Sequence, residues 1–327
     1  MPVDKKHVLE CLHELLSKNV LGDKQYASRY KGFRGELDFY AWFRKARGDK
    51  AHNGGYLLPK HRKDNSVDDP VYIVVNKHRP SNTDKKIFSS LQNIPCGNMY
   101  FIQYNSCIEF DKWKKHDVMS NGTCLPVPEM SVFLFDKVTR EFKDTELEKI
   151  ISNFRLTNKK DLYRCIPDKM ANDFIDQLFM YDELDLLDLY VDRLIFDGFI
   201  GYKRDRGIPS DIDLIVQSKS DPEKFLLLEI KEKDKSKTPP CGFGMDEHRI
   251  KDINEISVNT GLSYYYVVRH VNNQTERRFL EWLIIDMKKF IEGIKNSPTI
   301  AGGTGMRGLN SYNPTKVCSY EKFTKLR

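Results

Sequence analysis

Two stretches decide the fold: GIPSDIDLIVQ at residues 207–217 and FLLLEIKEKDK at residues 225–235. Each contains an apolar run of strand length, and the short polar turn between them predicts an antiparallel hairpin. Side chains alternate along a strand, so Glu229 and Lys231 point to the same face. A buried strand that carries such charges needs partners or a metal ion for them.

The same argument applies to Asp213, which interrupts the apolar run at residues 212–216. When the two strands pair, Asp213 and Glu229 lie side by side at one end of the sheet. Two carboxylates and water molecules suit Mg²⁺, a hard cation that prefers oxygen ligands. Lys231 then stands beside a water that attacks phosphorus, where it orients or deprotonates this water and offsets charge on the phosphate. The alternative is that Glu229 and Lys231 are edge-strand charges joined in a salt bridge.

Asp213 in SDIDLIV and Glu229-Ile230-Lys231 in LLLEIKE resemble the motif of the PD-(D/E)XK nuclease superfamily. The resemblance covers about residues 175–290. It implies that Asp213, Glu229 and the backbone of Ile230 bind Mg²⁺, while Lys231 serves the nucleophilic water. It also implies a mixed sheet flanked by helices in the C-terminal half.

The chain departs from the family motif at its first position, because Pro209 is followed by Ser210 and then by Asp211. Asp211 shares the strand face of Asp213, so either residue or both can be the ligand. The family also often takes an acid from a preceding helix. The candidates for an additional acid are Glu183, Asp185, Asp188 and Asp211.

Cations near the two strands suit a polyanionic substrate that brings its own negative charge. Lysines continue to alternate after Lys231, and the N-terminal part mixes Arg and Lys with Asn, Gly and aromatic residues. The alternative for the outer lysines is a solvated charge run. The residues that we expect to contact DNA are Lys233, Lys235, Arg249, Arg44, Arg47 and Arg62.

Length and composition predict a globular protein, and 327 residues are enough for two domains or one large one. Hydrophobic residues make up 40% of the chain, charged residues 31%, and the net charge of +6 fits nucleic-acid binding without requiring it. The seven cysteines form no CxxC pair, which favours reduced thiols and a cytoplasmic location. No apolar run reaches the ~18–20 residues of a membrane span.

Hydrophobic periodicity predicts the individual elements. Helices are expected at residues 5–19, 37–45, 146–154, 173–194 and 246–259. Strands are expected at residues 71–76, 99–105, 131–136, 212–216, 225–231 and 264–271, followed by a mixed stretch at 278–294. The fold class is therefore α/β (α+β overall), with an α+β DNA-recognition domain at residues 1–160 and the nuclease domain at 161–327.

These features predict a Mg²⁺-dependent, sequence-specific DNA endonuclease, similar to a type II or type IIS restriction endonuclease of a restriction-modification system. Its partner is double-stranded DNA, and no membrane is involved. One catalytic site cuts one strand, so a homodimer, a second subunit or sequential nicking is needed for a double-strand break. The alternatives are a structure-specific or modification-dependent nuclease of repair or defence, and a non-catalytic DNA-binding protein with a nuclease-like core.

Overall fold

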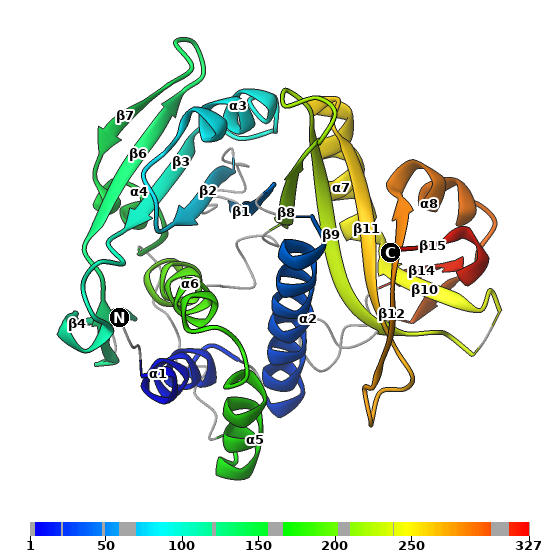
Figure 1. Cartoon of the computed structure of the whole chain (residues 1–327), viewed down its shortest axis with the longest axis horizontal. Helices are drawn as coiled ribbons and strands as arrows, with labels where there is room; N and C mark the ends of the chain where they lie inside the picture. The colour runs from blue at the N-terminus through cyan, green and yellow to red at the C-terminus, as the bar shows by residue number, and fades with distance from the viewer. Residues whose placement is uncertain are drawn as a thin grey trace. The chain divides into compact units, whose positions relative to one another are not determined.

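The computed structural model describes residues 4–20, 22–47, 50–58, 70–119, 122–155, 166–201, 210–237, 239–301 and 314–326, without the side chains of 152–155. The chain forms two compact units whose elements are labelled in Figure 1. Helix α2 (Asp23–Arg47) and strand β1 (Ala51–Leu58) contribute residues to both. Unit 1 comprises Met1–Tyr30, Tyr56–Ser89 and Cys96–Pro209, and unit 2 comprises Lys31–Gly55, Ser90–Pro95 and Ser210–Arg327.

This division differs from the predicted boundary at residue 160. Unit 2 takes residues 31–55 from the N-terminal part of the chain, whereas unit 1 retains residues 166–201. The physical reason lies in the core of unit 2, where Phe39 and Phe43 of α2 pack against the sheet. A boundary predicted from local patterns does not detect such a long-range contact.

Unit 1 contains a mixed sheet. The last residues of β1 pair antiparallel with β2 (Val71–Asn76), which runs parallel to β3 (Met99–Tyr104). Strands β6 (Met130–Asp136) and β7 (Glu141–Thr145) continue the sheet in antiparallel order. The other elements are α1 (Lys5–Ser17), α3 (Asn82–Ser90), η1 (Phe110–Lys112), β4 (Lys114–Asp117), β5 (Cys124–Val127), α4 (Leu147–Arg155), α5 (Asp168–Leu178), α6 (Glu183–Arg193) and the π-helix η2 (Leu194–Ile200).

Unit 2 also contains a mixed sheet. Strand β8 (Ser210–Gln217) pairs antiparallel with β9 (Phe225–Asp234), and β9 runs parallel to β11 (Ser263–Val271). Strands β12 (Phe279–Asp286) and β15 (Thr324–Lys325) follow. The remaining elements are β10 (Gly242–Asp246), α7 (Glu247–Thr260), α8 (Met287–Gly293), β13 (Thr299–Ala301), β14 (Pro314–Ser319) and η4 (Tyr320–Lys322). The α/β class (α+β overall) is confirmed.

The two faces of the sheet in unit 2 differ in character. Phe39 of α2 belongs to one buried cluster with Leu228 and Ile230 of β9. Side chains alternate along β9, so Glu229 and Lys231 project from the opposite face. Helix α7 packs against β11 and supplies side chains to that second face.

Strand β1 was not predicted, and Gly54 shows why it forms. A Cβ atom at Gly54 would lie 1.5 Å from the carbonyl oxygen of Ile212, so only glycine allows β1 to approach β8 so closely. The predicted helix at 173–194 is two helices, because the Asp182 carboxylate accepts a hydrogen bond from the Leu184 amide and caps a new start. Among the described residues, no helix has both the length and the apolar character to cross a membrane.

Candidate metal centre

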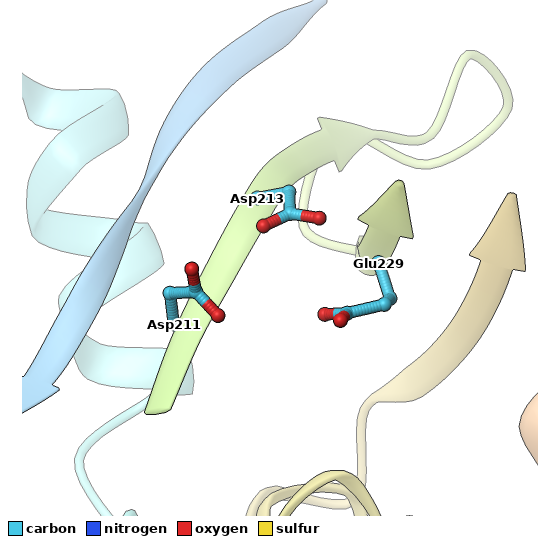
Figure 2. Close-up of side chains that lie close together, drawn as sticks. All are labelled: Asp211, Asp213 and Glu229. Atoms are coloured by element: carbon cyan, nitrogen blue, oxygen red, sulfur yellow. The ribbon is translucent and has the colours of Figure 1, made fainter. Parts of the chain in front are cut away.

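Three carboxylates converge beside strands β8 and β9 (Figure 2). Ligand oxygen atoms of Asp211, Asp213 and Glu229 all lie within 4.8 Å of one another. Asp211 and Asp213 come from the first half of β8, and Glu229 comes from β9. The structure therefore brings together the predicted ligands Asp213 and Glu229, and Asp211 joins them.

Asp213 is held by both its side chain and its backbone. The regular pairing of β8 with β9 ends at Leu214 opposite Leu228. One residue earlier in β8, Oδ2 of Asp213 accepts a hydrogen bond of 2.5 Å from the Ile230 amide. The Asp213 carbonyl accepts another, of 2.6 Å, from the hydroxyl of Tyr40 on α2. The contact of Ile230 with the cluster is thus through its amide, and a role for its carbonyl stays a prediction.

Lys231 forms ion pairs with two of the carboxylates. Its Nζ lies 3.1 Å from Oε1 of Glu229 and 3.5 Å from Oδ2 of Asp213. Burial opposes the charge, but both carboxylates outweigh it and raise the pKa of Lys231 well above its usual range. Because β9 lies between β8 and β11, these are not edge-strand charges. The Lys231 side chain as a whole is 37% exposed.

Neighbouring carboxylates favour the charged form of Lys231, whereas burial and neighbouring carboxylates disfavour the charged form of Asp213. The Asp213 side chain is only 2% exposed, and burial raises the pKa of Asp213 well above its ordinary value. Lys231 lowers this pKa, whereas Glu229, Asp211 and Glu36 raise it further. The negative charges gathered here therefore exceed what Lys231 can balance at Asp213.

Glu36 is a site residue that the sequence analysis missed. It lies on α2, one helical turn before Tyr40, and its charge acts on Asp213. The available indication was its spacing of four residues from Tyr40, beside the buried Phe33 and Leu37 of the same helix. Glu36 is thus an acidic neighbour of Asp213 on a helix, and a role for it in the site is a proposal.

The other predicted helix acids belong to unit 1. Glu183, Asp185 and Asp188 lie on α6. The Asp188 carboxylate binds the Lys77 ammonium at 2.7 Å and the Tyr104 hydroxyl at 2.5 Å. These contacts give Asp188 a role in the packing of unit 1.

Arg249, which we expected to contact DNA, lies beside the carboxylates of the cluster. Its residue surface is 9% exposed, and it projects from the first turn of α7. Nε donates to Oε1 of Glu229 at 2.9 Å, and Nη2 contacts Oε2. Nη1 donates to the Ser210 hydroxyl at 2.5 Å, and Nη2 lies 3.0 Å from Oδ1 of Asp211.

The other predicted DNA contacts that the structure describes lie in unit 2. Lys233 is half-buried on β9, where burial lowers its pKa and Asp246 opposes the change. Lys235 is exposed, with its Nζ 5.1 Å from the ring centroid of Tyr320. Arg44 and Arg47 are exposed in the last turn of α2, where cations also suit the helix dipole. Arg62 lies outside the described residues.

Comparisons with models of protein families, with characterised proteins and with solved structures found no match to this chain. The function must therefore be argued from the site itself.

Proposed function

We propose that this protein is a Mg²⁺-dependent DNA endonuclease that hydrolyses phosphodiester bonds in double-stranded DNA. The observation that carries the proposal is the convergence of Asp211, Asp213 and Glu229 within 4.8 Å, next to the charged Lys231. Hydrolysis of a phosphodiester needs a place for a cation, a positioned water and positive charge near phosphorus. The cluster offers groups suited to each.

The donor set fits Mg²⁺ by its chemistry. All three side chains offer hard carboxylate oxygens, which are the ligands that Mg²⁺ takes in proteins. The raised pKa of Asp213 supports an added cation, because an excess of buried negative charge is relieved by one. Mg²⁺ bound here would lower the pKa of a ligated water and offset charge on the phosphate.

Lys231 orients the water and stabilises charge on the phosphate. Without a metal ion, the charges of Asp213 and Glu229 raise the pKa of Lys231, so Lys231 is a protonated hydrogen-bond donor in this structure. Of the two roles that the sequence left open, a protonated Lys231 fits the orientation of the water. Glu36 acts on the same site from α2 as an additional acid.

The substrate class rests on the charge of the chain and of the site. The net charge of +6 and the cations near β9 suit the phosphate backbone. We propose a sequence-specific enzyme of the type II or type IIS restriction class that acts in the cytoplasm. A second copy or subunit would supply the cut in the other strand.

The first experiment is incubation of supercoiled plasmid with the full chain, in Mg²⁺ and in EDTA, alongside Glu229→Gln. Discrete Mg²⁺-dependent bands or nicks that the variant lacks are the expected result. A matched control is Asp221→Asn, which removes a carboxylate paired with Lys224 in the turn of the same hairpin. Its cleavage should equal that of the wild type.

Three substrates separate the specificities that a nuclease of this kind can have. Unmodified plasmid, methylated plasmid and a branched duplex are compared under the same conditions. Discrete bands from unmodified plasmid support a restriction enzyme, whereas cutting confined to methylated or branched DNA assigns a modification-dependent or structure-specific enzyme. Intact DNA with all three substrates would refute the nuclease proposal.

A further inference from the structure

Arg249 contacts both oxygens of the Glu229 carboxylate, which is a proposed ligand of the metal ion. Its Nε and Nη2 form a two-pronged contact with Oε1 and Oε2 of Glu229, whose side chain is 0% exposed. Lys231 also contacts Oε1. A planar guanidinium matches a carboxylate in this geometry and binds it strongly. A divalent cation therefore competes with the fork of Arg249 for Glu229.

The first residues of β8 also contact the guanidinium of Arg249. Nη1 of Arg249 donates to the Ser210 hydroxyl, and Nη2 donates to the carbonyl of Asp211 and pairs with its carboxylate. The guanidinium is thus enclosed by β8 and β9 and directed at two of the three carboxylates of the cluster.

The N-terminal end of helix α7 disfavours a cation at the position of Arg249. Arg249 lies in the first turn of a helix of 14 residues, and the N-terminal end of a helix carries partial positive charge. The contacts with Glu229 and Asp211 offset this repulsion. When a metal ion takes over Glu229, the guanidinium loses its main partner and needs another anion nearby.

We propose that Arg249 is a displaceable counter-cation of the metal site, which leaves Glu229 when Mg²⁺ binds and then contacts a phosphate of the substrate. This inference rests on the proposed function, which supplies both the metal and the phosphodiester. It makes Arg249 a substrate-binding residue that couples the two binding events. Metal binding and duplex binding then strengthen one another by the same factor.

The test measures Mg²⁺ affinity by calorimetry without DNA. Arg249→Met removes the charge and keeps the length of the side chain, so we expect Mg²⁺ to bind about tenfold more tightly than in the wild type. Arg249→Lys keeps the charge without the fork, and its affinity should lie between the two. Equal or weaker Mg²⁺ binding by a folded Arg249→Met protein overturns the proposal.

Arg269 provides a matched control. It is a buried arginine of the same unit whose Nη1 binds Oε2 of Glu232 on β9 at 2.9 Å, while its Nε binds Asp38 at 2.7 Å. Glu232 projects from the face of β9 opposite to Glu229. Arg269→Met should leave Mg²⁺ affinity unchanged, and a gain as large as that of Arg249→Met would overturn the assignment to the fork.

Coupling is measured by the anisotropy of a labelled short duplex in EDTA and in Ca²⁺, which takes the same oxygen ligands. We expect Ca²⁺ to tighten duplex binding by about tenfold in the wild type and by several-fold less in Arg249→Met. Undiminished coupling in the variant contradicts transfer of the guanidinium to phosphate. If Arg249→Met misfolds without metal, recovery of its thermal transition on adding Mg²⁺ supports the competition, and failure to recover it opposes it.

The two proposals fail separately. Cleavage by the wild type together with unchanged Mg²⁺ affinity in Arg249→Met retains the nuclease and refutes the counter-cation. Tighter Mg²⁺ binding by the variant, with no cleavage by either protein, retains the counter-cation at the metal site and refutes the nuclease. Absence of Mg²⁺ binding in both proteins refutes the counter-cation together with the metal site.

Discussion

Two buried aspartates of this protein have opposite surroundings. Asp197, in η2 of unit 1, has a side chain that is 5% exposed, and Asp213, in β8 of unit 2, has one that is 2% exposed. Oδ1 of Asp197 lies 2.5 Å from Nη1 of Arg29 and 2.7 Å from Nδ2 of Asn19. Oδ2 of Asp197 lies 3.4 Å from Nη1 of Arg193.

The partners decide the direction of each pKa shift. Burial opposes ionisation of Asp197, but Arg29 and Arg193 outweigh it and lower the pKa of Asp197 below its ordinary value. Burial raises the pKa of Asp213, and neighbouring carboxylates add to the rise. Burial is similar at the two residues, but arginine partners favour the charged form of Asp197, whereas neighbouring carboxylates disfavour the charged form of Asp213. A buried group whose charge is disfavoured in this way is the candidate for function.

The largest effect should come from neutralising Asp213. Asp213→Asn removes a proposed metal ligand, so we expect cleavage of plasmid to fall by about 10³-fold. The metal-free variant should nevertheless melt at the same temperature as the wild type or a few degrees higher, because the substitution removes a poorly compensated buried charge. Plasmid cleavage and thermal denaturation in EDTA measure the two outcomes. A large drop in melting temperature would show that the charge of Asp213 stabilises the metal-free fold, as we expect of Asp197 in unit 1.

Neutralising Asp197 should have the reverse consequence. Asp197→Asn leaves the buried guanidinium groups of Arg29 and Arg193 without their carboxylate, and we expect a loss of about 3–5 kcal/mol in the free energy of unfolding. Mg²⁺ affinity in the fraction that remains folded should not change. Denaturant titration and calorimetry test this prediction, and a variant as stable as the wild type would refute it.

The pH dependence of stability should also differ in sign. The raised pKa of Asp213 means that its contribution is fully present below its ordinary pKa of 3.8 and is lost as pH rises through the folded-state pKa. The lowered pKa of Asp197 means that its contribution is present above 3.8 and is lost as pH falls through the folded-state pKa. The free energy of unfolding of the wild type relative to Asp213→Asn should therefore fall as pH rises, whereas that relative to Asp197→Asn should fall as pH decreases. Both differences are measured in EDTA at several pH values. The same pH dependence of stability for both variants would contradict the opposite pKa shifts of Asp213 and Asp197.

A third carboxylate gives the smallest effect. Burial opposes ionisation of Glu281, but hydrogen bonds with Lys325, Tyr320 and His270 lower its pKa to about 2. The side chain of its partner Lys325 is 62% exposed, so solvent screens this pair, and Glu281→Gln should cost about 1 kcal/mol at pH 7. The cost should shrink as pH falls from about 4.5 toward 2. Urea midpoints at pH 7, 5 and 3.5 provide the measurement, and a cost independent of pH would exclude this ionic explanation.

The hairpin and its charges were predictable because the information is local. The apolar runs around Asp213 and Glu229 define two strands, and alternation alone places Lys231 beside Glu229. The register Leu214 opposite Leu228 then follows from the burial of one face. The strands predicted at residues 71–76 and 264–271 likewise carry continuous apolar patterns.

The other parts depend on contacts between distant segments. The AHNGGYLL sequence of β1 lacks the composition of a strand, and it forms one because Gly54 fits against Ile212. The role of Glu36 depends on α2 packing in unit 2, which local periodicity does not reveal. The burial of Arg249 was also unpredictable, since an arginine in a first helical turn is ordinarily solvated.

The interleaving of the two units has a consequence for the timing of synthesis. Residues 31–55 are synthesised before the strands within residues 225–271. Phe39 and Phe43 are therefore not covered until those strands have been made. The carboxylates of β8 and β9 meet only after Glu229 has been synthesised. An unfinished chain that stops before Glu229 therefore leaves Phe39 and Phe43 uncovered and lacks one of the three carboxylates of the candidate metal centre. In a cell whose own DNA is within reach, the cutting activity proposed here becomes available only after Glu229 has been synthesised.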